Sequence, residues 1–262
     1  MATAEVNGAA IAYDDTGGDG PAVVLGHGFL MDRTMFDAQV SALADRFRVV
    51  TFDQRGFGET DYDGEPFTYW DSAGDCLGLM DHLGIDRAVV GGMSQGGFVA
   101  LRVALLAPER VRGLILLDTQ AGPEDADVIP LYQGMIDDWV ANGPSDALAE
   151  ATASLIIGDP ELAAVWIAIW KSRPQESLAN PGRTLLGRES IADRLGEITV
   201  PAVIVHGTAD VSISIDKAEA LAEGLVGSSG VVAVEGGSHA TNMTHPGPTN
   251  DAILAFLDGL PD

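Results

Sequence analysis

Short apolar runs alternate with segments of helical spacing along most of the chain. The runs are rich in β-branched residues at consecutive positions, which is typical of strands buried on both faces of a parallel sheet. They span residues 22–27, 48–53, 87–92, 113–118, 201–207 and 230–236. Near the N-terminus, Asn7-Gly8 lies between two short strand-like runs and predicts a hairpin. The alternation predicts an α/β fold, with a mostly parallel central sheet flanked by helices.

Two of the segments between the runs have clear helical patterns. Residues 68–84 carry apolar side chains three or four positions apart, which predicts one apolar face. These side chains are Trp70, Ala73, Leu77, Met80 and Leu83. Residues 97–110 are apolar nearly all round, which predicts a buried helix that Pro108 ends.

The alternation is interrupted once, between residues 121 and 190, where helical segments follow one another without a convincing strand. We therefore predict a core of residues 1–120 and 191–262, interrupted by a helical cap of residues 121–190. The insertion is either an ordinary subdomain or a lid over a pocket where the strands end. Three of the four tryptophans fall in it: Trp139, Trp166 and Trp170. As a lid, it would use them to line a substrate pocket; otherwise they would pack within the cap.

The net charge of the chain argues against two classes of binding partner. The 262 residues include 39 acidic and 14 basic ones, giving a net charge of −25. A surface this acidic repels nucleic acids and anionic membranes, so we expect neither as a partner. The acidity indicates either solubility at high salt or steering of cationic substrates.

The sequence contains no recognisable membrane or export segment. No apolar run approaches the ~18 residues of a membrane span, and the first ten residues lack the basic and apolar regions of a secretory signal. Cys76 is the single cysteine, which excludes an internal disulfide and suits a reducing compartment. We therefore expect a cytoplasmic protein.

The stretch Gly92-Met93-Ser94-Gln95-Gly96 matches the pattern G-x-S-x-G. It follows a predicted strand and opens a predicted helix, as a nucleophile elbow requires. Strand and helix pass closely in such a turn, so the positions two residues either side of the serine must be small. A phosphate-binding loop is excluded because no lysine follows, and the dinucleotide pattern G-x-G-x-x-G is absent here. Ser94 is therefore the candidate nucleophile.

A serine hydroxyl needs a base to accept its proton and an acid to orient that base. His239, in a glycine-containing loop after the last predicted strand, is the candidate base, with His245 next. The remaining histidines are expected to shape a turn, to lie on a helix and to sit in the core: His27, His82 and His206.

The acid has two candidates. Asp210 follows the strand of residues 201–207, and Asp118 ends the strand of residues 113–118. We favour Asp210, because the order Ser94, Asp210, His239 is typical of this architecture. Asp53 also ends a strand, but we expect it to stabilise its own turn.

A second requirement is a pair of donors for the oxyanion of the tetrahedral intermediate. The backbone N–H of Gln95 opens a predicted helix, where unpaired donors and the helix dipole favour an anion. The stretch Gly26-His27-Gly28-Phe29 follows an early strand, and its glycines let the backbone turn towards Ser94. The N–H groups of Phe29 and Gln95 are therefore the predicted oxyanion hole.

Together these motifs resemble the α/β-hydrolase superfamily over nearly the whole chain. The matching stretches are GHGF, FDQRGFGET, GGMSQGGFVALRVALLAPERVRGLILLDT, VPAVIVHGTAD and VEGGSHATNMTHP, in that order. The resemblance implies that Ser94 is the nucleophile, His239 the base and Asp210 its orienter. It also implies that the reaction needs no cofactor and no metal.

The insertion resembles the cap of the enol-lactonase and cofactor-free haloperoxidase (perhydrolase) branches, alongside capped esterases. Gln95 departs from the Met common in those branches and would add a polar group to the pocket. A serine at position 94, in place of aspartate, argues against the epoxide-hydrolase and haloalkane-dehalogenase branches.

We therefore predict a serine hydrolase that cleaves a small-molecule carboxylic ester or lactone through an acyl-enzyme. The same three residues could instead serve perhydrolysis, C–C bond hydrolysis or amide hydrolysis. A non-catalytic small-molecule receptor on the same fold is the alternative of another class. The sequence does not indicate an oligomeric state.

Overall fold

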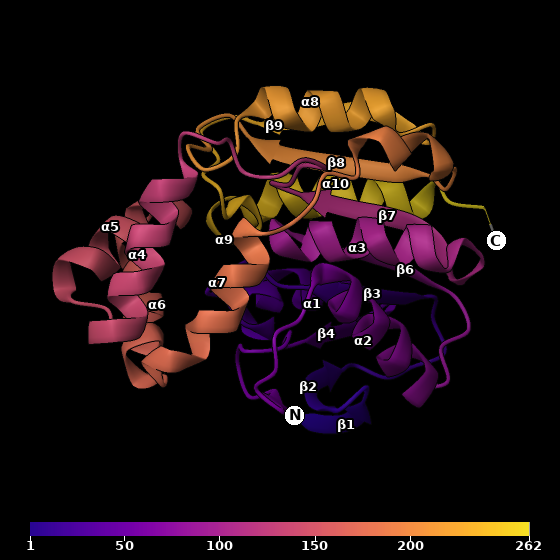
Figure 1. The fold of residues 1–262 in the computed structure, drawn as a ribbon. Coiled ribbons are helices and arrows are strands. Elements are labelled where there is room, and N and C mark those ends of the chain that lie inside the picture. The colour runs from indigo at the N-terminus through magenta and orange to yellow at the C-terminus, as the bar shows by residue number, and fades with distance from the viewer. Residues whose placement is uncertain (262) are drawn as a thin grey trace.

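The strands form one mixed sheet in the computed structural model, which describes residues 1–261 (Figure 1). Their order across the sheet is β1-β2-β4-β3-β6-β7-β8-β9, and the short β5 pairs with β2 outside this path. The strands are β1 (Ala2–Val6), β2 (Ala9–Asp15), β3 (Ala22–Gly26), β4 (Arg48–Phe52), β5 (Asp61–Tyr62), β6 (Ala88–Met93), β7 (Val111–Leu117), β8 (Ala202–Gly207) and β9 (Ser228–Val234). All six predicted runs are strands, and the α/β fold class is confirmed.

The pairing is parallel from β4 through β3, β6, β7 and β8 to β9, and antiparallel at β1, β2 and β5. The predicted hairpin joins β1 to β2, with Asn7 and Gly8 at φ 48° and 79°. Two successive positive φ angles are typical of the tight turn that Asn-Gly favours. Because these six neighbouring strands run the same way, the loops after them emerge at one edge of the sheet.

Burial follows position in the sheet. Every residue of β3, β6 and β8 is buried, as expected for central parallel strands. The expectation of burial on both faces is wrong for β9, where Val232 is 42% exposed. This strand lies at the end of the sheet order and pairs only with β8, so less of the protein covers it.

Helices cover both faces of the sheet (Figure 1). In this view α2 and α3 lie in front of the strands and pack on each other, while α1 and α10 pack together behind them. The helices outside the insertion are α1 (Asp37–Leu43), α2 (Tyr69–His82), α3 (Gln95–Leu106), α8 (Ile215–Gly224), α9 (Thr241–Thr244) and α10 (Pro246–Asp258), with the 3-10 turns η1 (Arg33–Phe36), η2 (Pro108–Arg110) and η4 (Ala192–Glu197). The predicted buried helix is α3, whose residues from Gln95 to Ala104 are all buried.

The buried face of α2 differs from the predicted apolar stripe. Ala73 and Met80 are buried, but Trp70, Leu77 and Leu83 are only half-buried. The buried set instead comprises Tyr69, Ser72, Ala73, Asp75, Cys76, Leu79 and Met80. Asp75 lies on this face because Arg55 donates two hydrogen bonds to its carboxylate, at 2.5 and 2.9 Å. Because of this pairing, Asp75 faces inward, although hydrophobic spacing alone predicts that a polar residue here is exposed.

Residues 121–190 contain helices and no strand among the described positions: α4 (Ile129–Asn142), α5 (Asp146–Ile156), α6 (Pro160–Ser172), η3 (Gln175–Leu178) and α7 (Ala179–Leu186). In Figure 1 this group stands at the left, beside the edge where the parallel strands end. Two contacts tie it to the loop after β3. Trp170 Nε1 donates to the Leu30 carbonyl at 2.8 Å, and Arg173 pairs with Asp32 at 2.6 Å. None of the helices in residues 1–261 combines the length and apolarity that crossing a bilayer would require.

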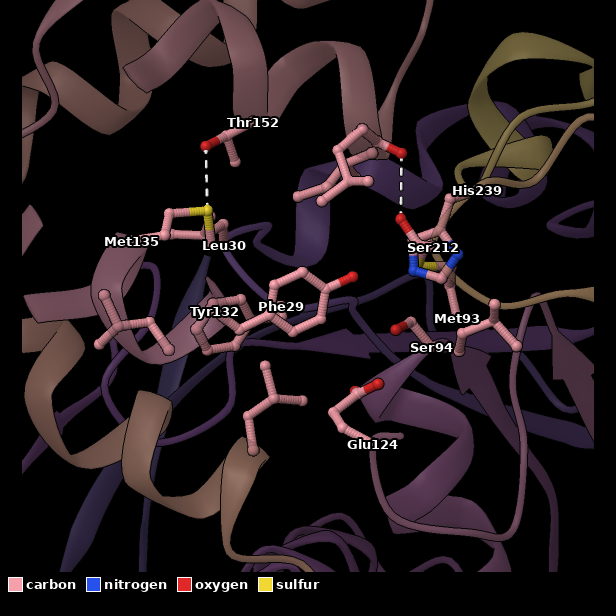
Figure 2. A pocket seen from close by; sticks show the side chains of 15 residues that line it. Phe29, Leu30, Met93, Ser94, Glu124, Tyr132, Met135, Thr152, Ser212 and His239 are labelled. Atoms are coloured by element: carbon pink, nitrogen blue, oxygen red, sulfur yellow. Dashed lines mark hydrogen bonds between the residues drawn. The ribbon is translucent and has the colours of Figure 1, made fainter. Parts of the chain in front are cut away.

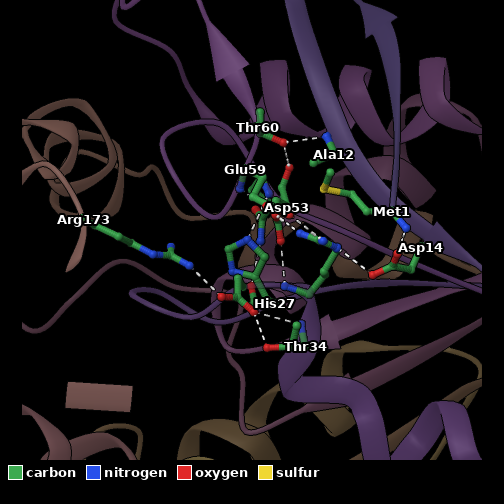
Figure 3. Close-up of polar contacts among 12 residues, drawn as sticks. Met1, Ala12, Asp14, His27, Thr34, Asp53, Glu59, Thr60 and Arg173 are labelled. Atoms are coloured by element: carbon green, nitrogen blue, oxygen red, sulfur yellow. Dashed lines mark hydrogen bonds and ion pairs between the residues drawn. The ribbon is translucent and has the colours of Figure 1, made fainter. Parts of the chain in front are cut away.

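The loops after β3 and β4 are held together around Asp53 (Figure 3). Its carboxylate accepts hydrogen bonds from the backbone N–H groups of Arg33 and Glu59, at 2.7 and 2.8 Å. The Arg33 guanidinium adds an ion pair to Asp53 at 2.5 Å and reaches Asp14 and Glu59 at 2.7 Å. The expectation that Asp53 stabilises its own turn is confirmed.

We expect Arg33→Ala to lower the free energy of unfolding by about 3–5 kcal/mol, because it leaves the fully buried Asp53 without its counter-charge. Arg46→Ala is the matched control: Arg46 also pairs with an aspartate, Asp258, but both side chains are half exposed. That change should cost much less, because an exposed ion pair contributes little to stability. Urea denaturation of both variants measures the difference, and equal losses would contradict this role of Arg33.

Candidate active site

Ser94 sits at a strained turn between β6 and α3. Its φ is 50° and its ψ is −112°, a backbone conformation that residues other than glycine rarely adopt. A Cβ atom on Gly92 or Gly96 would approach the Gly26 carbonyl oxygen to 2.3 or 1.8 Å. Only glycine fits at either position. With glycine there, β3, β6 and α3 can pack closely, and the turn between β6 and α3 places Ser94 beyond the edge of the sheet.

His239 and Asp210 come together from two neighbouring loops. His239 lies in the loop after β9, and its Nδ1 is 2.8 Å from Asp210 Oδ2. The other carboxylate oxygen of Asp210 accepts the backbone N–H groups of Ser212 and Ile213, at 2.8 and 2.9 Å. These contacts fix the carboxylate, which in turn orients the imidazole and leaves its Nε2 for the reacting group.

A second histidine approaches the same carboxylate. His206, fully buried in β8, has Nε2 at 3.3 Å from Asp210 Oδ2 and at 2.8 Å from the Ile213 carbonyl. Burial alone would raise the pKa of Asp210, but the charge of His239 and hydrogen bonds from both histidines hold it well below its ordinary range. Burial would lower the pKa of His206, but the hydrogen bonds to Asp210 and to the Ile213 carbonyl and the charges of Asp118 and Asp210 together raise it. His206 is a core residue, as expected, and it also contacts the acid.

Asp118, the other candidate acid, is occupied elsewhere. It ends β7 with φ 47°, and its carboxylate accepts the N–H of Gly207 at 2.9 Å and the N–H and hydroxyl of Thr241 at 3.2 and 3.0 Å. No hydrogen bond joins it to His239 among the described residues. Burial raises the pKa of Asp118 to about 7. The geometry therefore pairs His239 with Asp210.

Ser94 and His239 line one pocket (Figure 2). Both are nearly buried, at 6% exposure each. Within the described chain, no hydrogen bond directly joins Ser94 Oγ to His239. Catalytic hydrogen bonds are often long in structures without substrate and shorten when substrate binds.

The predicted oxyanion donors lie beside the serine. Gln95 is the first residue of α3, and Phe29 lines the pocket with Ser94. The backbone N–H groups of Phe29 and Gln95 donate to no other group in residues 1–261, so both are free for a ligand. The prediction that the Gln95 side chain adds a polar group to the pocket is wrong. This side chain does not line the pocket, and its Oε1 accepts a hydrogen bond from the Tyr69 hydroxyl at 3.3 Å.

The pocket wall is mostly apolar and comes from both the core and the insertion. It encloses about 600 Å³, including the part open to solvent. The core supplies Phe29, Leu30, Met93, Ser94, Ser212, Ile213 and His239; residues 121–190 supply Glu124, Tyr132, Met135, Ile136, Thr152, Leu155, Ile156 and Leu185. The site therefore has a hydrophobic interior with a few polar groups, as small-molecule sites do.

The three candidate tryptophans do not line this pocket, so that prediction is wrong. Trp139 and Trp170 pack edge to face, with ring centroids 5.9 Å apart, and Trp166 is also buried. Their rings stabilise the helices of the insertion instead, because a large aromatic side chain contributes most when fully packed.

Several residues that do line the pocket carried no signal in the sequence. Glu124 follows β7 in an irregular loop, where no periodicity indicates direction. Tyr132 and Thr152 lie on helices whose inward faces depend on packing against neighbours, and Ser212 follows Asp210 in a loop. For Ser212, the only signal in the sequence is its position two residues after Asp210, which indicates that it lies near the site.

The remaining histidines have other surroundings. His27 is buried and holds its own turn, with Nδ1 at 2.8 Å from the Gly28 carbonyl and Nε2 accepting the Gln54 N–H at 2.9 Å. His82 is exposed at the end of α2, and His245 lies 3.1 Å from the Thr244 hydroxyl. The expected turn-shaping role of His27 is confirmed.

One cluster has potential metal ligands close together. Single ligand atoms of Asp118, His206 and Asp210 lie within 4.8 Å of one another. Hydrogen bonds already engage both carboxylates and the His206 Nε2 atom. A metal ion would have to displace these contacts, so the cluster does not fit a metal site.

A family model described as "alpha/beta hydrolase fold" matches residues 21–246. The chain belongs to this family. Its match covers the elbow, the Asp210 loop and the His239 loop, and the resemblance found in the sequence is confirmed.

Several relatives of this α/β hydrolase are named as hydrolases, of different kinds. It is 31% identical to a thermophilic esterase from Thermogutta terrifontis, with a TM-score of 0.88 over 98% of this chain and 97% of the other. It is 27% identical to the enol-lactonase from Burkholderia xenovorans LB400, with a TM-score of 0.87 over 98% and 99%. A relative from Azorhizobium caulinodans named "Putative carbamate hydrolase RutD" is 28% identical, over 95% and 96% of the two chains. The family and these relatives support hydrolase activity.

The depressed pKa of Asp210 leads to a prediction about stability and pH. Its folded pKa lies below the unfolded value of about 3.9, so the charged form stabilises the fold fully above that pH and loses this effect as the pH falls. The advantage of wild type over Asp210→Asn should therefore shrink by roughly 1 kcal/mol between pH 5 and pH 3. Urea denaturation at both pH values measures it, with the exposed Asp127→Asn as control. An advantage that is unchanged, or that grows towards pH 3, would contradict the charge role of Asp210.

Proposed function

We propose that this α/β hydrolase cleaves a small carboxylic ester or lactone, using Ser94 as nucleophile, His239 as general base and Asp210 to orient His239. The observation that carries the proposal is the 2.8 Å contact of His239 Nδ1 with Asp210 in a pocket shared with Ser94. The esterase and enol-lactonase among the relatives favour an ester or lactone as substrate.

In the first half-reaction, Ser94 Oγ attacks the carbonyl carbon while His239 Nε2 takes the hydroxyl proton. Asp210 stabilises the imidazolium that forms, and its lowered pKa keeps it charged for this purpose. The negative charge moves to the carbonyl oxygen, where the N–H groups of Phe29 and Gln95 bind it. His239 then gives the proton to the leaving alkoxide, and an acyl-enzyme remains on Ser94.

Water completes the cycle by the same route. His239 takes a proton from a water molecule, whose oxygen attacks the acyl carbon, and the oxyanion forms again beside Phe29 and Gln95. Collapse of this intermediate returns the proton to Ser94 Oγ and releases the carboxylic acid. A lactone follows the same steps, with the alcohol and the acid joined in one product.

We further propose that residues 121–190 are a cap that encloses the substrate. This is supported by the many pocket-lining residues that the insertion supplies, from Glu124 to Leu185. An enclosed, mostly apolar site strengthens the oxyanion hydrogen bonds because it excludes water.

A carbamate or amide is the second candidate substrate, favoured by the relative named as a carbamate hydrolase. The same residues would serve, because His239 would give its proton to a leaving nitrogen. Perhydrolysis and C–C bond hydrolysis would use the same serine and histidine. A receptor without turnover is disfavoured by the unoccupied N–H groups of Phe29 and Gln95, which serve a developing charge better than a neutral ligand.

The proposal predicts that Ser94→Ala lowers kcat for short p-nitrophenyl esters by about 10⁴-fold or more. Ser212→Ala is the matched control, since it removes another serine hydroxyl from the same pocket. That hydroxyl donates to the Leu155 carbonyl at 3.1 Å. It should retain most of the activity. Release of p-nitrophenol from acetate, butyrate and octanoate esters measures both variants and wild type.

Three results would contradict the proposal. Equal turnover by wild type and Ser94→Ala would place the activity outside this pocket. No turnover of esters by wild type, together with cleavage of carbamates or amides, would support the second candidate. Tight binding of esters without turnover would support the receptor.

A further inference from the structure

Glu124 is the one side chain of the pocket whose charge the proposed reaction does not use. Among the described residues that line the pocket, it carries the only carboxylate. Its side chain is 7% exposed, so it is nearly buried in a mostly apolar wall. A buried charge is costly unless something compensates it, so its presence here needs an explanation.

Arg188 supplies part of that compensation and fixes the carboxylate. Its Nη1 donates to Glu124 Oε1 at 2.8 Å and to the Leu185 carbonyl at 2.9 Å, and its Nε donates to the Gly122 carbonyl at 3.0 Å. The guanidinium also lies 4.3 Å from the ring centroid of Phe98. The Arg188 side chain is 1% exposed and does not line the pocket, whereas Glu124 does.

The second oxygen of Glu124 is available. Oε2 accepts no hydrogen bond from any group in residues 1–261. Figure 2 shows Glu124 below Ser94 in the close-up, with Tyr132 among the other labelled side chains. The pocket thus holds a fixed, unpaired acceptor besides the reacting groups. An unpaired acceptor in a mostly apolar wall discriminates between ligands that can donate to it and ligands that cannot.

The neighbouring groups make this part of the pocket electronegative. Burial raises the pKa of the Tyr132 hydroxyl, and the charges of Glu124, Asp210 and Asp125 raise it further against the opposing effect of Arg188. Three titratable groups lie near Glu124: Arg188, which pairs with it, and Tyr132 and Tyr69, whose pKa values its charge raises. The net charge of −25 adds an attractive field for cations over the whole molecule.

We propose that Glu124 is a specificity-determining residue, which selects esters that carry a protonated amine and disfavours esters that carry a carboxylate. The ammonium N–H would donate to Glu124 Oε2, while the ester carbonyl lies at Ser94. This inference rests on the proposed ester hydrolysis and names its class of substrate. It also gives a role to the acidic composition, since the field outside the pocket and the carboxylate inside it favour the same charge.

The probes are three sets of acetate esters with matched shape. The alcohol part ends in a dimethylammonio group, in an isopropyl group of the same size, or in a carboxylate. A spacer of two, three or four methylene groups covers the reach from Ser94 to Glu124. A tertiary amine cannot take the acyl group as a stable amide, so acetate release reports hydrolysis alone. The same end groups on the acyl side of p-nitrophenyl esters test the other orientation.

For wild type, kcat/KM relative to the hydroxide-catalysed rate should fall in the order ammonium, isopropyl, carboxylate for at least one spacer. In Glu124→Gln, which keeps an acceptor for Arg188, the ratio of ammonium to carboxylate esters should fall by ~10- to 100-fold. The rate for the isopropyl ester, which carries no charge, should change less than the rates for the two charged esters. Glu161→Gln, which removes an exposed charge from the insertion, is the control and should leave the ratio unchanged.

The failures are distinguishable. Cleavage of the isopropyl ester with an unchanged ratio in Glu124→Gln would overturn the inference and leave the proposed function standing. Absence of Ser94-dependent cleavage of every ester would overturn both. If Glu124→Gln does not fold, the order of kcat/KM among the three esters for wild type tests the inference by itself. A preference for the carboxylate ester, or an ammonium preference that disappears in 1 M NaCl, would overturn the role of Glu124, because salt screens surface charge far more than a buried group.

Discussion

The close approach of α3 to β3 at Gly26 is the constraint on which the candidate active site depends. A methyl group on Gly92 or Gly96 would collide with the Gly26 carbonyl, so strand, turn and helix can pack this tightly only with glycine at both positions. The tight packing is what holds Ser94 at a positive φ. The same turn starts α3 immediately after Ser94, which leaves the Gln95 N–H without a partner and next to the hydroxyl. One steric condition therefore places both the proposed nucleophile and one proposed oxyanion donor.

The order of the strands brings the other groups to that turn. The loops after β3, β6, β8 and β9 emerge at one edge of the sheet, and they carry Phe29, Ser94, Asp210 and His239. Residues more than a hundred positions apart in the chain thus become neighbours without any long-range motif between them. Ion pairs then fix the surrounding loops. Asp53 with Arg33 stabilises the side of the Phe29 loop, and Arg188 fixes Glu124, so the few basic residues of an acidic chain compensate the carboxylates that are buried.

What the sequence predicts well is what local rules decide. The elbow follows from glycine spacing, and Asp210 and His239 follow from being the polar residues directly after parallel strands. What it predicts poorly depends on packing between elements that the pattern does not relate. The tryptophans pack within the insertion rather than on the pocket, since a helix in a bundle has more than one apolar neighbour to choose from. The inward face of α2 includes Asp75 because Arg55 pairs with it, and hydrophobic spacing cannot anticipate a buried ion pair.

The residues that the sequence predicts and those that it does not predict also have different chemical roles. The core supplies the proposed catalytic groups, which would act on any ester carbonyl. The family shares this core, while its members act on different compounds. The insertion and the loop before it supply the walls, which are apolar apart from a few side chains. Apolar walls discriminate weakly between ligands of similar size, whereas an unpaired buried acceptor rejects a ligand that cannot donate to it, and rejects an anion more strongly. Glu124 is such an acceptor, and Arg188 fixes its position rather than leaving it to adapt. The identity of the substrate therefore depends more on this one carboxylate, in a loop without sequence pattern, than on the motifs that identify the family.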